Sequence, residues 1–126
     1  MKSDMSNSPL DYLKHIRDEA RFLETATYGK SQVAFLDDDV LKRACVRAVE
    51  IIGEASKKVS DVFRAKHPDV EWKKMAGMRD RPIHDYFGVD YYIVFDVARN
   101  KAPVLAAEMD WIIEQETAPG SGEAAH

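Results

Sequence analysis

The sequence predicts an all-α fold, a compact bundle of about five to six helices. Apolar residues recur along most of the chain at the three- and four-residue spacing of a buried helix face. No stretch alternates apolar and polar residues as a half-buried strand does, and there is no Asn-Gly hairpin signal. With 126 residues and 45% apolar side chains, the chain can build one core but not two.

The first helix is expected to begin at Ser8 and Pro9. A serine side chain can cap the helix, and proline suits the first helical position. Apolar residues then recur at helical spacing until Gly29, which is expected to end the helix. Residues 31–36 can form one further turn.

Three consecutive aspartates at 37–39 predict the start of a second long helix, because they supply a cap and the negative charge favoured there. Ser60 is expected to cap a short third helix over residues 61–66. His67 and Pro68 should end it, and His67 is expected to face solvent in the loop.

Asp69 is expected to cap a fourth helix that runs through Met78 and ends at Gly88. Asp90 should cap a fifth helix, and a sixth should begin at Ala102 and Pro103. The residues of the sixth helix expected to lie mostly in the core are Val104, Leu105, Met109, Trp111, Ile112 and Ile113.

The domain organisation follows from these elements. Residues 9–116 should form a single domain, with a flexible N-terminus at 1–8 and a small, polar, flexible tail at 117–126. The single cysteine, Cys45, excludes an internal disulfide and is expected to be a core thiol, so we expect a reducing, cytoplasmic location. No apolar run is long enough to span a membrane.

The charge distribution is uneven. The net charge of −4 argues against nucleic-acid binding by the whole surface. Between Lys57 and Arg81, however, basic residues outnumber acidic ones eight to four. Lys73, Lys74 and Arg81 are therefore candidate contacts for an anionic partner such as RNA, although a basic, solvated helix face would look the same.

The stretch from Met78 to Asp90 concentrates polar chemistry, with two arginines, three aspartates, one histidine and one tyrosine. In an ideal helix Arg79 and His84 would differ by about 140° around the axis. Pro82 should distort such a helix, because it cannot donate a backbone hydrogen bond. The distortion could bring both side chains to one cavity.

An arginine and a histidine in one cavity suit metal-free RNA cleavage, in which the 2′-hydroxyl attacks the adjacent phosphate and leaves a cyclic phosphate and a 5′-hydroxyl. The histidine can transfer protons near neutral pH, and the arginine can bind the phosphate oxygens. Asp80 is close enough in sequence to hold Arg79 or the imidazole of His84. No metal is expected, because ligand spacing is absent.

A purely structural alternative remains open. Arg79 could pair with Asp80 or Asp85, His84 could cap or pack, and Tyr86 could belong to the core. Spacing alone does not decide between these readings.

A wider sequence pattern bears on that choice. The stretch Met78 to Asp90, followed by residues 91–97, resembles the signature of HepT-like proteins, the ribonuclease toxins of the HEPN superfamily. The segment Ile51-Ile52-Gly53-Glu54-Ala55 is similar to part of that family's second helix. The resemblance covers roughly residues 10–116 and implies a HEPN-like bundle.

The resemblance also implies a function. Arg79 and His84 would be the catalytic pair of a metal-independent ribonuclease, supported by Asp80, at a cleft shared by two subunits of a homodimer. The RNA substrate would be transfer or messenger RNA. The partner would be an antitoxin of the minimal nucleotidyltransferase type, which transfers AMP from ATP to the tyrosine at position 86. ATP would serve the partner, so no cofactor is expected for this chain.

The sequence also allows a function of a different class. The chain could be a non-catalytic HEPN-type helical module that binds a nucleotide or a protein. The presence of both Arg79 and His84 favours the nuclease, whereas the acidic net charge mildly favours the binding module.

Overall fold

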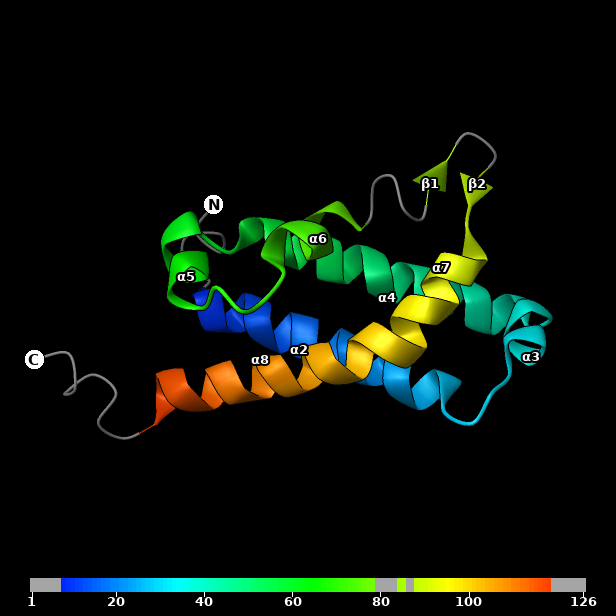
Figure 1. Ribbon diagram of the computed structural model, residues 1–126, viewed down its shortest axis with the longest axis horizontal. Coiled ribbons are helices and arrows are strands. Elements are labelled where there is room, and N and C mark those ends of the chain that lie inside the picture. Colours follow the sequence, from blue (N-terminus) through cyan, green and yellow to red (C-terminus); the bar gives the residue numbers. More distant parts are fainter. Residues whose placement is uncertain (1–7, 79–83, 86–87, 119–126) are drawn as a thin grey trace, which may run out of the picture.

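The all-α prediction is confirmed. The computed structural model describes residues 8–78, 84–85 and 88–118, and these form a helical bundle with one very short strand pair (Figure 1). The elements are α2 (Pro9–Thr27), α3 (Gln32–Leu36), α4 (Asp39–Lys58), α5 (Asp61–Lys66), α6 (Trp72–Gly77), β1 (His84–Asp85), β2 (Gly88–Val89), α7 (Tyr91–Asp96), the π-helical turn η1 (Val97–Lys101) and α8 (Ala102–Thr117).

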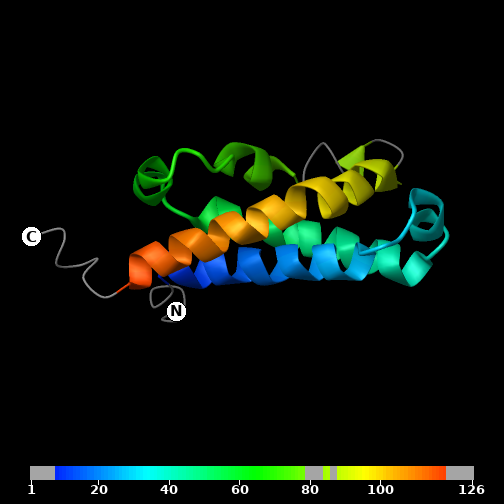
Figure 2. The same ribbon diagram turned by 60° about the horizontal axis from the view of Figure 1, so that its bottom comes forward.

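Three long helices carry the core. Helix α2 packs along both α4 and α8, and the two views of the bundle show these three helices running side by side (Figures 1 and 2). The short helices α6 and α7 pack on α4, and α5 follows the C-terminal end of α4. The fully buried side chains at the centre include Leu13, Ile16, Leu23, Val49, Ile52, Met109 and Ile112.

The predicted helix starts are mostly confirmed. The Asp38 side chain accepts a hydrogen bond from the Leu41 N–H at 3.0 Å, and Ser60 accepts one from the Phe63 N–H at 3.1 Å. The backbone N–H of Ser8 donates to the Asp11 carboxylate at 2.9 Å. Such caps stabilise a helix start by about 1 kcal/mol each.

The predicted fourth helix is wrong at both ends. Helix α6 begins only at Trp72, so Asp69 does not cap it, and it ends at Gly77. His84 lies in a strand instead, and Gly88 has a backbone φ of +117°, which a helix does not accommodate. A helix reaching position 88 would also have to accept Pro82, whose nitrogen carries no hydrogen to donate.

The predicted fifth and sixth helices form one unbroken helical run. Helix α8 does begin at Ala102, but η1 joins it directly to α7. The Ala102 N–H donates to the Val97 carbonyl, five residues back, as in a π-helix. Pro103 lacks an N–H, and the wider turn just before it lets the chain continue without a break.

The expected core thiol is confirmed. Cys45 is fully buried, and burial raises the pKa of its thiol to about 11, with a smaller contribution from the charge of Asp38. At neutral pH it therefore stays protonated and unreactive.

Within the described residues, no helix has the length and apolar character needed to cross a lipid bilayer. The expected flexible ends, 1–8 and 117–126, lie mostly outside the described residues.

Candidate active site

The Met78–Asp90 stretch is held at both of its ends by helices that pack on α4. Helix α6 leads into it and is anchored by the buried side chains of Trp72 and Met75. Helix α7 leads out of it, capped by the Asp90 side chain, which accepts hydrogen bonds from two backbone N–H groups. Because α4 supports both helices, it fixes the two ends of the stretch relative to each other.

The backbone of His84 is tied to the exit side of this stretch. Strands β1 and β2 pair antiparallel, with His84 opposite Val89 and Asp85 opposite Gly88. The Val89 side chain is partly buried and packs against the core. The histidine backbone is therefore positioned by the same segment that starts α7.

The other predicted site residues, Arg79, Asp80, Arg81 and Tyr86, lie outside the described residues, as does Pro82. Their convergence with His84 stays a prediction.

A groove of about 700 Å³ opens beside the entry to the stretch, between α6 and the helical run of η1 and α8. Met78, the residue that precedes Arg79, lies in its wall. We call this hollow the α6–η1 groove; the lining residues used below are Lys73, Lys74, Met78, Asn100, Lys101 and Glu108.

The α6–η1 groove is lined by three lysines together with four acidic residues, Asp69, Glu71, Asp96 and Glu108. Lys73, Lys74 and Lys101 are all exposed. Lys74 approaches Glu71 at 3.4 Å, but both side chains are largely exposed, and such a pair contributes only about 0–1 kcal/mol. Lys73 and Lys74 are two of the predicted RNA contacts, and both line the same groove as Met78, the residue that precedes Arg79.

Lys101 and Asn100 line the groove as well, although neither was predicted to. Both belong to the π-helical turn, which adds a residue to the helical repeat and so changes which side chains face α6. The Asn100 amide donates to the Asp96 carboxylate at 2.7 Å across this turn. Proline at position 103, inside a helical pattern, is the one signal in the sequence that pointed to a distortion there.

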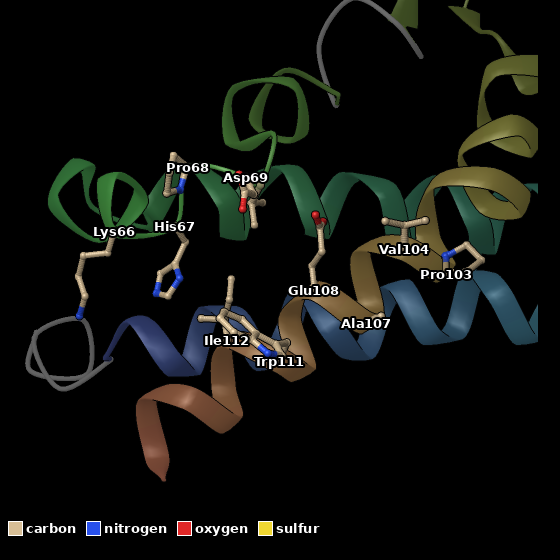
Figure 3. A pocket seen from close by; sticks show the side chains of 11 residues that line it. Lys66, His67, Pro68, Asp69, Pro103, Val104, Ala107, Glu108, Trp111 and Ile112 are labelled. Carbon is tan, nitrogen blue, oxygen red and sulfur yellow. The ribbon is translucent and has the colours of Figure 1, made fainter. Parts of the chain in front are cut away.

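A second hollow, of about 860 Å³, lies between the chain segment from Lys66 to Val70 and helix α8 (Figure 3). We call it the Trp111 hollow. Of the α8 residues expected to lie mostly in the core, Leu105, Met109 and Ile112 are buried, whereas Val104 and Trp111 are not. Their exposures are 59% and 58%, because no element of the described chain covers this face of α8.

The expectation that His67 faces solvent was also wrong. Its side chain is only 13% exposed, and its Nε2 lies 3.0 Å from the Glu116 carboxylate at the end of α8. The ring also packs against Phe63, with 5.0 Å between ring centroids. Burial tends to raise the pKa of Glu116, but hydrogen bonds from His67 and Lys66 outweigh it and lower that pKa.

Negative charge gathers at the boundary of the two hollows. Asp69, Val104 and Glu108 line both. Burial raises the pKa of Glu108, and the nearby carboxylates of Glu71 and Asp69 raise it further. Among the described residues, no three His, Cys, Asp or Glu side chains come together as a metal site would require.

Comparison with known proteins gives the family. The model of the family described as "Ribonuclease HepT-like" matches residues 16–112, which is most of the chain. The chain therefore belongs to the HepT-like ribonuclease family, as the sequence resemblance implied.

Curated relatives agree with this assignment. "Putative RNase TTE0752" from Caldanaerobacter subterraneus subsp. tengcongensis is 45% identical over 86% of this chain and 97% of its own length. "Putative RNase MJ1216" from Methanocaldococcus jannaschii is 37% identical, over 90% of each chain. "Probable ribonuclease HepT" from Thermococcus cleftensis is 38% identical over 84% of this chain and 96% of its own length. No solved structure matches.

Proposed function

We propose that this protein is a metal-independent endoribonuclease that acts as the toxin of a toxin–antitoxin system. The observation that carries the proposal is the family match over residues 16–112, combined with the presence in this chain of Arg79, His84 and Tyr86 at motif spacing. The lysines of the α6–η1 groove supply a path for the RNA backbone beside the motif.

In the proposed reaction the RNA 2′-oxygen attacks the adjacent phosphorus and the bond to the 5′-oxygen breaks. A base must take the proton of the 2′-hydroxyl, and an acid must give one to the departing 5′-oxygen. His84 can perform either step, and Arg79 can stabilise the negative charge that develops on the non-bridging oxygens. Asp80 would orient them. The products are a 2′,3′-cyclic phosphate and a 5′-hydroxyl.

A homodimer would complete the site. Each chain contributes one Arg79 and one His84, whereas this reaction uses both a proton acceptor and a proton donor. Two motifs facing each other across a two-fold axis would place a second histidine within reach of the same phosphate. The proposed substrate is transfer or messenger RNA.

Control of the toxin would come from a partner. We assign Tyr86 as the acceptor of AMP, transferred from ATP by a cognate minimal nucleotidyltransferase. Two residues from His84, the added phosphodiester and nucleoside would occupy the space of the substrate phosphate and repel it.

The metal-independent mechanism is tested with purified protein and RNA in excess chelator. Cleavage should continue at an unchanged rate, because the proposed chemistry uses only side chains of the protein. The new ends should be cyclic phosphate and 5′-hydroxyl, as read by their resistance to ligation and by labelling with polynucleotide kinase. Strict dependence on added magnesium would contradict the mechanism.

The groove lysines give a separate prediction about RNA binding. Replacing Lys73, Lys74 and Lys101 together with glutamine should weaken RNA binding at low salt and reduce the salt dependence of the affinity. Each lost phosphate contact removes roughly one unit from the slope of log affinity against log salt. Equilibrium binding titrations at several salt concentrations measure both effects.

A matched control for the groove lysines is a change of equal charge elsewhere. Lys14, Lys57 and Lys58 are exposed on α2 and α4, outside the groove lining. The triple change of these residues to glutamine should leave the slope close to that of the wild type. An equal loss in both variants would show that the groove has no special part in binding RNA.

A further inference from the structure

Apolar, acidic and basic side chains line the Trp111 hollow. Its apolar side chains lie on both sides: Trp111 and Val104 on α8, and Pro68 on the segment opposite (Figure 3). Two carboxylates, of Asp69 and Glu108, lie at one side. Lys66 lies at the other end, more than half exposed although paired with Glu116 at 3.2 Å.

Packing does not explain why the side chain of Trp111 is exposed. An indole with 58% of its surface in water forgoes much of the free energy that burial would give. The other tryptophan, Trp72, is 5% exposed, and its Nε1–H donates to the His67 carbonyl at 2.9 Å. Aromatic side chains presented in this way serve as stacking surfaces for unpaired nucleobases.

Glu108 and Trp111 are three residues apart on α8, so they lie on neighbouring positions of one helix face. A ring stacked on Trp111 would have its edge near the Glu108 carboxylate, and Asp69 faces the same space (Figure 3). Ionised carboxylates only accept hydrogen bonds. They therefore suit a base that carries an amino group, which adenine, cytosine and guanine do.

Uracil is a poorer fit for the same edge. It has no amino group, and its one ring N–H stands between two carbonyl oxygens that would face the carboxylates. Burial raises the pKa of Glu108, and the charges of Glu71 and Asp69 raise it further; a hydrogen bond donated by a base to this carboxylate would offset both effects. Hydrogen-bond chemistry thus separates the amino-bearing bases from uracil.

The hollow also continues into the α6–η1 groove, since Asp69, Val104 and Glu108 line both. That groove reaches Met78, beside the catalytic motif. A strand whose phosphates follow Lys73, Lys74 and Lys101 would arrive at Trp111 with a base some nucleotides away from the cleaved bond.

We propose that the Trp111 hollow is a nucleobase subsite for single-stranded RNA, in which Trp111 stacks on a base with an amino group (adenine, cytosine or guanine) and Glu108 accepts a hydrogen bond from that amino group. The inference rests on the proposed function, because it gives the RNA substrate a second contact distant from the cleavage site. It adds a base preference that the motif does not supply.

The test uses short 2′-O-methyl oligomers of adenosine, cytidine or uridine, which lack the attacking hydroxyl and so bind without being cleaved. Adenosine and cytidine oligomers should quench the tryptophan emission of the wild-type protein and bind about tenfold or more tightly than uridine oligomers. Trp111→Ala should lose the quenching, since Trp72 is buried. It should also bind the adenosine and cytidine oligomers about tenfold more weakly, because the stacking surface is removed.

Glu108→Gln tests the base preference separately from affinity. A glutamine amide both donates and accepts, so the uridine oligomer should gain affinity and the preference should fall to within about twofold. Glu114→Gln is the matched control, because Glu114 is exposed on the same helix and outside the hollow. It should keep the wild-type preference.

The outcomes distinguish failure of the nucleobase subsite from failure of the proposed nuclease function. Equal affinity for all three oligomers, or unchanged binding by the Trp111→Ala variant, would overturn the subsite. If the emission responds to no oligomer, the subsite is also overturned, and an apolar side chain of a protein partner becomes the expected occupant. Selective binding by a protein that cleaves no RNA would support the subsite and contradict the proposed nuclease.

Discussion

Replacing His84 with alanine should abolish the growth arrest that follows expression of this protein alone. The same substitution should reduce RNA cleavage by the purified protein by roughly 10²–10⁴-fold, the range that a general acid or base contributes. Arg79→Ala should have a comparable effect, because the negative charge on the phosphate would lose its fixed cation. Colony counts after induction and single-turnover cleavage rates measure the two results.

His15→Ala is the matched control for the His84 change. His15 is exposed on α2, so its loss should alter neither the arrest nor the rate. Equal thermal midpoints of the His84→Ala variant and the wild type would show that the bundle is intact. Full toxicity of the His84→Ala variant would remove His84 from the reaction and favour the non-catalytic binding module.

Incubation with the cognate nucleotidyltransferase and ATP should add AMP to Tyr86 and remove nuclease activity. The phenol oxygen attacks the α-phosphorus of ATP, pyrophosphate leaves, and the protein gains the mass of one AMP group for each transfer. Modified protein should lose RNA cleavage almost completely, because the added nucleotide competes directly with the substrate phosphate. Intact-mass spectrometry and a cleavage assay on the same sample measure both.

Tyr86→Phe should escape this modification and remain toxic when the partner is co-expressed. Tyr92→Phe is the control, because Tyr92 lies close to Tyr86 in the sequence and is 60% exposed. This variant should still be modified as the wild type is. A Tyr86→Phe variant that still gains the mass of AMP would refute the assignment. Tyr86 would then be a core or interface tyrosine.

Features determined by neighbouring residues could be predicted from the sequence. The caps at Asp38, Ser60 and Asp90 each depend on a side chain and a backbone N–H two or three residues away. Periodic apolar residues likewise identified the faces of α2 and α4 that are buried. The helical class and the family resemblance followed from such local patterns, and both are confirmed.

Features that depend on distant parts of the chain could not be predicted. His67 is covered because Glu116, 49 residues later, reaches its ring. Val104 and Trp111 are apolar residues at helical spacing, like those of the core, and only the packed bundle shows that their face of α8 is uncovered. The π-helical turn likewise arises where Pro103 interrupts a helix that packing continues.

The sequence indicated which residues could form the candidate site, but not the backbone structure around them. Sequence spacing singled out Arg79, Asp80, His84 and Tyr86, and the roles assigned to them stay predictions. The strand that holds the His84 backbone was not predicted, because two-residue strands leave no alternating pattern to detect.

The short β1–β2 strand pair and the helical bundle should not open as one cooperative unit. A pair of two-residue strands has few hydrogen bonds, and such a ribbon is marginally stable by itself. Its backbone amides should therefore exchange with solvent through local opening, at a lower free energy than the global unfolding that exposes α4. Stability measured on the helices thus does not report how firmly His84 is held, and any partner that covers the ribbon would protect its amides without shifting those of the core.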